Sequence, residues 1–241
     1  MGQTRGVAAP GKPLIGLTTY VDTARWGIWE VPAAVLHASY VAALQRAGAR
    51  AVLLPPDPED DGILDRLDGL VVTGGPDLDP RLDGRPTEGT GPIPDRDAYE
   101  VLLWHGARAR DLPTLGICRG LQAMALAHGG SLIPDLDSAG FGTAHREVPG
   151  TYTEHDVRFE DGSQIAGIYG TTRMRINSSH HQAVGDPGTT VPTGWAHDGI
   201  IEVCEVPDAR FAIGVQWHPE HPDRASDDLP LLRALVEAAS R

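Results

Sequence analysis

The amino-acid sequence predicts an α/β protein built on a parallel sheet. In the first half of the chain, short apolar segments of strand composition alternate with segments of helical periodicity, which is the pattern of strand–helix–strand units. Residues 112–130 repeat this pattern with a sharp turn between Gly116 and Gly120, where an extended apolar stretch meets a helix. The second half holds more strand and more loop, and we find no internal repeat or linker in the sequence. We therefore expect one domain over residues 13–241, preceded by a flexible tail over residues 1–12.

The expected strands and helices can be assigned in chain order. Each expected strand is a short apolar or alternating run, and the set covers 13–20, 50–55, 69–73, 112–117, 155–159, 173–178, 199–206 and 211–217. Each expected helix carries apolar residues at helical spacing, and the set covers 31–48, 63–67, 95–110, 118–128 and 229–240. The short link between the last two strands predicts a hairpin. Composition predicts loops over 21–32, 81–96 and 131–150, the last of them a candidate flap.

Composition and charge narrow the class of protein. The 20 basic and 33 acidic residues give a net charge of −13, which argues against binding to nucleic acid or to an anionic membrane surface. No apolar run reaches the length of a transmembrane helix. Two cysteines, Cys118 and Cys204, are too few for a disulfide framework and suit a reducing compartment, so we expect a cytoplasmic protein.

Cys118 is the first candidate for chemistry. It lies at the turn between a strand and a helix, with Gly116 and Gly120 two residues away on either side, which is the layout of a nucleophile elbow with Cys in place of Ser. The first turn of a helix favours the thiolate, which is the reactive form of cysteine. The alternative interpretation is a buried cysteine used as a small apolar side chain, and this segment alone leaves both open.

A second candidate follows the strand over 211–217. Pro219 keeps His218 extended, and residues i and i+2 of an extended chain project to the same side, so Glu220 can reach and orient the imidazole of His218. Taken singly, His218 is better interpreted as a histidine in a surface turn and Glu220 as a solvated carboxylate, and it is the joint pattern that favours a catalytic pair. The Gly74–Pro76 turn after the strand over 69–73 can present backbone N–H groups to a ligand, although such a turn is also an ordinary connection.

Four motifs together carry a resemblance to a known family. They are Gly-Gly-Pro-Asp-Leu-Asp-Pro over 74–80, Gly-Ile-Cys-Arg-Gly-Leu-Gln over 116–122, Asn-Ser-Ser-His-His-Gln over 177–182 and Gly-Val-Gln-Trp-His-Pro-Glu over 214–220. In this order they resemble class I glutamine amidotransferase-like hydrolases, and within them the γ-glutamyl-γ-aminobutyrate hydrolase family of peptidase C26 type. The resemblance spans nearly the whole chain. It implies a flavodoxin-like α/β fold, with a mainly parallel central sheet flanked by helices.

The resemblance also implies roles for individual residues. Cys118 would be the nucleophile, His218 the acid and base, and Glu220 the carboxylate that orients His218. The backbone N–H groups of Gly75 and Arg119 would form the oxyanion hole. The side of the pocket that holds the glutamyl group would be lined by Gln122, His180, His181 and Gln182.

No metal or other cofactor is expected from these motifs. Two adjacent histidines, His180 and His181, point in different directions, and a zinc site needs three or four ligands. The other histidines outside the motifs are interpreted as structural or solvent-exposed, namely His128, His145, His155, His197 and His221. Cys204 lies in an apolar strand and is interpreted as a core residue.

The family resemblance implies a hydrolase that cleaves the γ-glutamyl amide bond of γ-glutamyl amines, such as γ-glutamyl-γ-aminobutyrate or γ-glutamyl polyamines, through a thioester. Two alternatives stay open: a glutaminase subunit that passes ammonia to a synthetase, and a catalytically inactive binding or regulatory homologue. The expected partner is a small γ-glutamyl substrate, with no nucleic acid and no membrane, and a homodimer is left open. The released amine would contact the loops over 21–32, 79–97 and 138–153.

Overall fold

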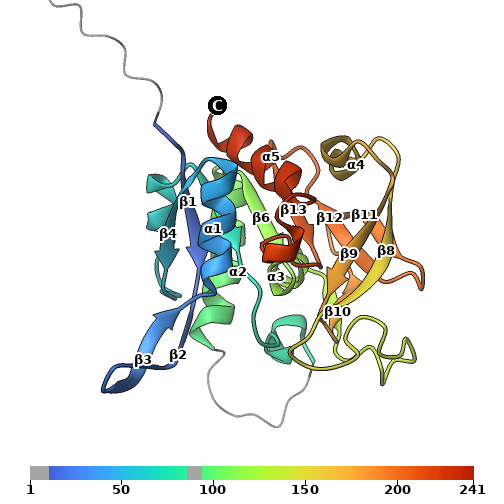
Figure 1. Ribbon diagram of the computed structural model, residues 1–241, viewed down its shortest axis with the longest axis horizontal. Coiled ribbons are helices and arrows are strands. Elements are labelled where there is room, and N and C mark those ends of the chain that lie inside the picture. The colour runs from blue at the N-terminus through green and yellow to red at the C-terminus, as the bar shows by residue number, and fades with distance from the viewer. Residues whose placement is uncertain (1–10, 86–93) are drawn as a thin grey trace, which may run out of the picture.

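The computed structural model describes residues 11–85 and 94–241. These residues form an α/β fold, in which one large twisted sheet lies between two layers of helices (Figure 1). The predicted fold class, a mainly parallel central sheet flanked by helices, is confirmed. The expected tail lies outside the described residues except for Gly11 and Lys12, and so does the 86–93 part of the expected loop. Within the described ranges, no helix is both long and apolar enough to cross a membrane.

Parallel strands make up the part of the sheet that positions the site. Their order is β4 (Arg50–Leu54), β1 (Leu14–Thr18), β5 (Gly69–Val72), β6 (Thr114–Ile117) and β13 (Ala212–Val215). Strand β13 comes from the far end of the chain and pairs with β6, with Val215 opposite Ile117. Because neighbouring parallel strands end at the same edge, the segments that follow β6 and β13 lie side by side.

Helices cover both faces of these strands. Helices α1 (Ala38–Ala47) and α5 (Leu229–Ala239) contact each other on one face, and α2 (Asp95–Ala109) and α3 (Arg119–Ala127) contact each other on the opposite face. Strand β5 shows how the faces are divided: Val71 packs into the core beneath α1 and α5, whereas Leu70 and Val72 pack beneath α2 and α3. Both faces of a parallel strand are buried, so these strands read as continuous apolar runs.

The other half of the sheet is antiparallel. Strand β12 (Ile201–Glu205) forms the predicted hairpin with β13, and the sheet continues through β11 (Val191–Ala196), β8 (Thr153–Phe159) and β9 (Arg173–Ser178). The sequence did not predict β7 (Ser131–Ile133), β10 (Ala183–Asp186), β11 or the short helix α4 (Gln164–Tyr169). Strands β7 and β10 are only three and four residues long, and two register shifts interrupt the pairing of β11 with β12. None of these three strands therefore shows a clear alternation of apolar and polar residues in the sequence.

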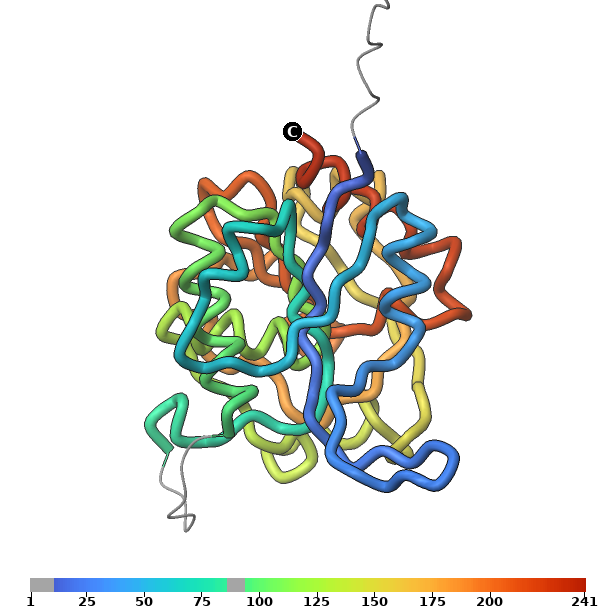
Figure 2. The backbone as a smooth tube through the Cα atoms, turned by 90° about the vertical axis from the view of Figure 1, so that its left-hand side faces the viewer, coloured from blue at the N-terminus to red at the C-terminus, as the bar shows by residue number. Residues whose placement is uncertain are grey.

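The prediction of a loop over 21–32 is wrong. Strands β2 (Tyr20–Trp26) and β3 (Trp29–Val35) form a separate two-stranded hairpin, which projects from the body at the edge where β1 ends (Figure 2). Gly27 has a φ of 56° at the start of the two-residue turn, which brings Trp26 opposite Trp29. Both faces of this hairpin are largely exposed, so no apolar alternation marks it in the sequence. Because β3 runs to Val35, helix α1 begins at Ala38 and not at residue 31.

Short 3-10 helices complete the chain. They are η1 (Gly62–Arg66), η2 (Pro80–Asp83) and η3 (Pro222–Arg224). The first corresponds to the short helical segment predicted over 63–67, and the helices predicted over 95–110, 118–128 and 229–240 agree with α2, α3 and α5 to within one or two residues. After β7, the segment through Gly150 is irregular, as expected.

Candidate active site

Cys118 lies on a strained turn between β6 and α3. Its φ of 52° and ψ of −106° are unusual for a residue with a side chain, and such strain costs about 1–3 kcal/mol. The flanking glycines are required by close packing. A Cβ atom on Gly116 would lie 2.7 Å from the backbone of Gly120, and one on Gly120 would lie 2.1 Å from the carbonyl oxygen of Val72. The structure thus forms the elbow that the sequence predicts, and the Cys118 side chain is 7% exposed.

His218 and Glu220 follow β13 at the same edge of the sheet. The Nδ1 atom of His218 lies 2.8 Å from Oε1 of Glu220; the Glu220 side chain is buried, and that of His218 is 12% exposed. Asn177 at the end of β9 fixes the backbone of His218 from both sides: its amide nitrogen donates to the His218 carbonyl at 3.2 Å, and its oxygen accepts from the His218 N–H at 3.1 Å. The i, i+2 geometry inferred from Pro219 is therefore present, and Asn177 is a positioning residue that sequence reasoning did not assign.

Cys118 and His218 meet because β6 and β13 are neighbours. A Cβ atom on Gly74 would touch both the imidazole of His218, at 3.3 Å, and the Cβ of Cys118, at 3.7 Å. Burial disfavours the protonated imidazole, but the charges of Glu220 and Cys118, and hydrogen bonds with both, outweigh it and raise the pKa of His218 well above its usual value. The arrangement favours a protonated His218 beside Cys118.

The turn after β5 supplies N–H groups beside the thiol. Tyr40 of α1 accepts a hydrogen bond from the Gly74 N–H at 3.0 Å, which leaves the next N–H, that of Gly75, at the mouth of the site. Arg119 is the first residue of α3, and an N–H group in the first turn of a helix has no intrahelical acceptor. The two predicted oxyanion donors, Gly75 and Arg119, line one cleft with Cys118. A Cβ atom on Gly75 would lie 2.1 Å from Nη1 of Arg96, so only glycine fits there.

The side chain of Arg119 points away from the cleft into a buried ion cluster. Its guanidinium contacts Asp97 and Glu100, both on α2. Arg96 pairs with Glu100 at 2.9 Å and also donates to the carbonyl oxygen of Gly74 at 2.8 Å. Asp97 accepts from the backbone N–H of Asp79 at 2.8 Å. The cluster therefore holds the 74–79 turn against the start of α3, which fixes both predicted oxyanion donors.

Removing Arg119 from this cluster leaves the buried Asp97 without its cationic partner and Glu100 with Arg96 alone. We expect Arg119→Met to lower the free energy of unfolding by about 3–5 kcal/mol, because Asp97 and Glu100 stay buried. The matched control is Arg25→Met, which removes an exposed pair with Glu30 and should change stability by less than about 1 kcal/mol. Urea denaturation of both variants measures the difference. Equal, small losses would show that the cluster is not structural.

The residues predicted for the glutamyl side line a small cleft of about 290 Å³ next to Cys118. Gln122 is buried, and its amide nitrogen donates to the carbonyl oxygen of Gln182 at 3.0 Å. His181 is the most exposed, and its two ring nitrogens lie 3.1 Å from Asp135 and 2.9 Å from Asp77. The side chain of Gln182 turns away to the carbonyl oxygen of Pro134 at 3.1 Å. Those three residues line the cleft together with His180, and Arg146 adds a cation that the sequence analysis did not assign.

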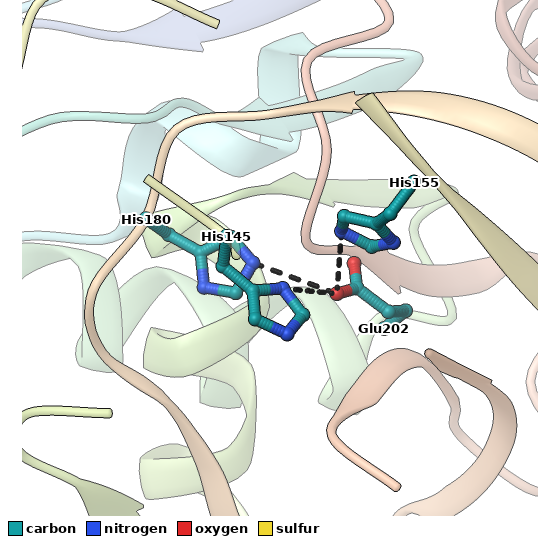
Figure 3. A group of neighbouring side chains, drawn as sticks. All are labelled: His145, His155, His180 and Glu202. Carbon is teal, nitrogen blue, oxygen red and sulfur yellow. Dashed lines mark ion pairs between the residues drawn. The ribbon is translucent and has the colours of Figure 1, made fainter. Parts of the chain in front are cut away.

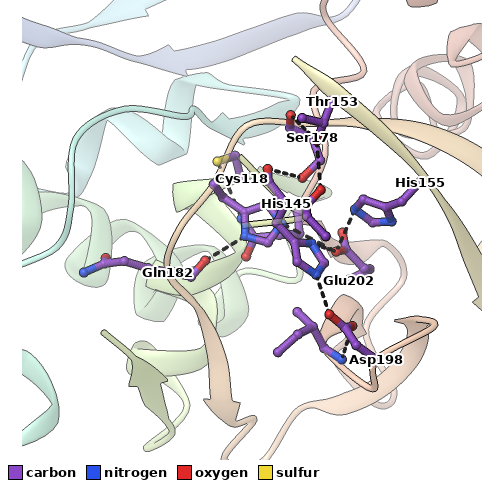
Figure 4. A network of polar contacts seen from close by, with 12 residues as sticks. Cys118, His145, Thr153, His155, Ser178, Gln182, Asp198 and Glu202 are labelled. Atoms are coloured by element: carbon purple, nitrogen blue, oxygen red, sulfur yellow. Dashed lines mark hydrogen bonds and ion pairs between the residues drawn. The ribbon is translucent and has the colours of Figure 1, made fainter. Parts of the chain in front are cut away.

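His180 lines the cleft, but the Nε2 end of its ring points into the interior of the protein. Its Nδ1 atom lies 2.8 Å from the carbonyl oxygen of Gln182, and its Nε2 atom points into a buried group that contains Glu202. Figure 4 shows that polar contacts connect this group to the neighbourhood of Cys118. His180 is thus a link between the cleft and the interior.

Gln216 is the contact to the thiol that sequence reasoning missed. It is fully buried, and its amide nitrogen donates to Sγ of Cys118 at 3.5 Å, while its oxygen accepts from Gln122 at 3.3 Å. Gln216 lies inside the Gly-Val-Gln-Trp-His-Pro-Glu motif, two residues before His218, so the signal was present in the sequence. An amide donor stabilises a thiolate more than a thiol.

A larger cleft of about 860 Å³ opens on the other side of His218. Tyr20 and Asp22 of the β2–β3 hairpin line it, together with Tyr40, Tyr152 and the Gly74–Pro76 turn. Tyr152 also packs against His218, with ring centroids 5.2 Å apart. Parts of the predicted amine-side segments over 21–32 and 138–153 therefore do reach the site. Within the described ranges, the residues that line this cleft include no Lys or Arg.

The fold and the site together define a class I glutamine amidotransferase-like protein: a cysteine elbow and a His-Pro-Glu segment on adjacent parallel strands. The sequence profile of the Peptidase C26 family matches residues 13–220. The chain belongs to this family.

Comparisons with individual proteins agree with this assignment. The chain is 42% identical over 236 residues to "Putative glutamine amidotransferase Rv2859c" of Mycobacterium tuberculosis, covering 95% of this chain and 75% of that protein. It is 32% identical over 216 residues to γ-glutamyl-γ-aminobutyrate hydrolase PuuD of Escherichia coli, covering 84% of each chain. Among solved structures, the glutaminase domain of CTPS from Trypanosoma brucei with bound acivicin superposes with a TM-score of 0.64, covering 94% of this chain and 93% of that chain. At 16% identity, this last likeness shows the fold alone.

Proposed function

We propose that the protein hydrolyses the γ-glutamyl amide bond of γ-glutamyl amines, with Cys118 as nucleophile, His218 as acid and base, and Glu220 as the group that orients His218. The observation that carries this proposal is the position of the elbow between two clefts. A small polar cleft on one side suits a glutamyl group, and a wider cleft on the other side leaves room for an amine larger than ammonia.

The first half of the proposed reaction forms a thioester. The Cys118 thiolate attacks the γ-carbonyl carbon, and the developing oxyanion accepts hydrogen bonds from the N–H groups of Gly75 and Arg119. Loss of one such donor typically costs about 10²–10³ in rate. Protonated His218 then gives its proton to the leaving nitrogen as the C–N bond breaks, and the free amine departs through the wider cleft.

The second half returns the enzyme to its starting state. Neutral His218 accepts a proton from water, the resulting hydroxide attacks the thioester, and the C–S bond breaks to release glutamate and the Cys118 thiolate. Glu220 accepts a hydrogen bond from Nδ1 of His218 and holds the imidazole in one tautomer, as the third member of a triad does. A free, reactive thiol suits a reducing compartment, and we place the reaction in the cytoplasm.

The charge of the wider cleft favours a cationic amine. Asp22 contributes a carboxylate that is paired with no cation among the lining residues, whereas the carboxylate of Glu220 is paired with His218. The ring of Tyr152 can face a cation, whereas the ring of Tyr20 already faces the guanidinium of Arg96 at 4.8 Å. The carboxylate of γ-aminobutyrate would meet no Lys or Arg among the described lining residues. We therefore place γ-glutamyl polyamines ahead of γ-glutamyl-γ-aminobutyrate as substrates.

A panel of γ-glutamyl compounds tests this proposal. We expect kcat/KM for at least one γ-glutamyl amine to exceed that for glutamine by about tenfold or more, which needs only about 1.4 kcal/mol of additional transition-state binding. Asp22→Asn should lower the ratio of kcat/KM for a γ-glutamyl polyamine over γ-glutamyl-γ-aminobutyrate by about two- to fivefold, as expected for an exposed charge. The measurement is glutamate release by the isolated chain under reducing conditions.

Two results would contradict the proposal. Turnover of glutamine alone, and only after a synthetase is added, would favour an ammonia-transferring glutaminase. No turnover of any compound in the panel, with Cys118 still reactive towards iodoacetamide, would favour a binding protein.

A further inference from the structure

Three histidines and one glutamate meet in the interior behind the small cleft. His155 lies on β8, Glu202 on β12, His145 in the irregular segment before β8, and His180 in the turn after β9. All four are buried, and one potential ligand atom from each lies within 4.8 Å of all the others. Figure 3 shows the three imidazoles arranged around the carboxylate of Glu202. We call this group the histidine–glutamate cluster.

The inward-facing atoms of the histidine–glutamate cluster have the spacing of metal ligands. Oε1 of Glu202 lies 3.2 Å from Nδ1 of His145, 3.5 Å from Nε2 of His155 and 3.5 Å from Nε2 of His180. In a tetrahedral site with bonds of about 2.0–2.1 Å, neighbouring ligand atoms lie about 3.3–3.4 Å apart. The three separations from Glu202 bracket that value, and the ring nitrogens lie within 4.8 Å of one another.

The outward-facing nitrogens decide how the rings are protonated. Nε2 of His145 lies 3.0 Å from Asp198, and Nδ1 of His180 lies 2.8 Å from the carbonyl oxygen of Gln182. Nδ1 of His155 is 3.4 Å from the carbonyl oxygen of Asp156. Each of these partners is an acceptor, so the outer nitrogen of each ring is placed to donate a hydrogen bond. Histidines that bind metals show this arrangement, with the second ring nitrogen donating to a carboxylate or a backbone carbonyl.

With the outer nitrogens donating, the three inward nitrogens point at one oxygen of the Glu202 carboxylate. None of the three inward nitrogens, nor either oxygen of Glu202, has a hydrogen-bond partner among the described residues, and all of these atoms are buried. An added proton satisfies one nitrogen–oxygen contact and leaves two lone pairs opposed. A divalent cation satisfies all four groups at once, and unpartnered buried polar groups are otherwise costly.

We propose that the histidine–glutamate cluster binds one zinc ion. Imidazole and carboxylate are both zinc ligands, and four protein ligands with no open position are typical of a structural site. The sequence argument against a metal considered only His180 with His181, and those two side chains do diverge. It could not pair His180 with residues from three other segments.

The proposed zinc would hold the wall of the small cleft. The carbonyl oxygen of Gln182, which accepts from Nδ1 of His180, also accepts from the amide of Gln122. The backbone carbonyl of His145 accepts from the hydroxyl of Ser178 at 2.8 Å and from the N–H of His180 at 3.1 Å. Loss of the ion should therefore loosen substrate binding and reduce stability without removing the Cys118–His218 pair.

Metal content and thermal stability of the full chain test this proposal. The purified protein is incubated with ZnCl2, dialysed against metal-free buffer and measured by elemental analysis, and we expect about one zinc per chain. Chelation should lower Tm, and Zn²⁺ but not Mg²⁺ should restore it, because bound ligand stabilises the native state. His155→Gln should reduce bound zinc at least tenfold, whereas His128→Gln, outside the cluster, should leave it unchanged.

A second measurement does not depend on the folding of any variant. Wild-type protein reconstituted with Co²⁺ should show the visible absorption of a tetrahedral cobalt centre. After chelation, KM for a turned-over γ-glutamyl compound should rise more than kcat falls. Wild-type protein that retains less than about a tenth of an equivalent of zinc, and whose Tm ignores both chelator and Zn²⁺, would overturn the proposal. Because zinc content, Tm and the cobalt spectrum need no knowledge of the substrate, they can fail while the proposed hydrolysis stands.

Discussion

Cys118→Ala should abolish hydrolysis while the protein stays folded. Without the sulfur no thioester can form, and we expect kcat to fall by about 10⁴-fold or more, as for the loss of a nucleophile in other catalytic triads. Alanine is smaller than cysteine and keeps the same backbone constraints at the elbow, where φ is 52°. The measurement is glutamate release on the best γ-glutamyl amine, with circular dichroism and Tm as checks on folding.

The second cysteine provides the matched control. Cys204 lies in the core on β12 and is fully buried, whereas Cys118 lines a cleft. Cys204→Ala should keep near-wild-type kcat, and iodoacetamide should label Cys118 in the wild-type protein much faster than Cys204. Retained activity in Cys118→Ala, or preferential labelling of Cys204, would show that Cys118 is not the nucleophile.

The elbow and the His-Pro-Glu segment could be predicted because each depends on a few adjacent residues. Gly116, Cys118 and Gly120 specify a sharp strand-to-helix turn, and Pro219 places His218 and Glu220 on one side of the chain. The convergence of the two could not be derived from local sequence. It depends on β13 pairing with β6, two strands separated by most of the second half of the chain.

The contacts that sequence reasoning missed all depend on long-range pairing. Asn177 reaches His218 because β9 ends at the same edge of the sheet, and Tyr40 reaches Gly74 because α1 packs against the turn after β5. The histidine–glutamate cluster needs the alignment of β8, β9 and β12 through β11, a strand that the sequence did not reveal. A single histidine in the sequence does not indicate which distant residues it will contact. The three histidines of the cluster therefore could not be grouped from the sequence.

The prediction of a loop over 21–32, where the structure has the β2–β3 hairpin, is wrong for a different reason. Strand prediction relies on one buried face, but most residues of β2 and β3 face solvent on both sides. The Trp and Val residues of β2 and β3 are typical of strands. Without alternation of apolar and polar residues, however, Gly27 alone does not predict which residues pair across the turn. The hairpin still matters for function, because Tyr20 and Asp22 line the wider cleft.

Polar contacts form a continuous path from the thiol to the proposed zinc site. Gln216 contacts Cys118 and Gln122, Gln122 contacts the Gln182 carbonyl, and that carbonyl contacts His180. Because each amide in this path is buried and hydrogen-bonded to the next, a change at one end removes a partner from its neighbour. The path explains why a structural ion could influence KM without contacting substrate.

His218→Asn should cost nearly as much as the loss of the nucleophile. Asparagine keeps a polar side chain but cannot transfer the proton, so we expect kcat to fall by about 10⁴-fold, and the double variant with Cys118→Ala should lose little more, because members of a catalytic unit are not additive. Glu220→Gln should lose about one to two orders of magnitude less, because Glu220 orients the imidazole and transfers no proton.

The pH profile separates the orienting role of Glu220 from a merely structural one. The Glu220 carboxylate favours protonated His218 and helps to raise its pKa well above the usual value, so wild-type activity should persist to a pH well above 6.5 before the imidazolium is lost. Glu220→Gln removes that charge, the pKa of His218 falls, and the basic limb of the kcat/KM profile should move to lower pH. Glu237→Gln, an exposed change on α5, should leave the limb in place. At 2.8 Å between Nδ1 and Oε1, a charged Glu220 should couple strongly to His218. A basic limb that does not move in Glu220→Gln would therefore show that Glu220 has no electrostatic effect on His218.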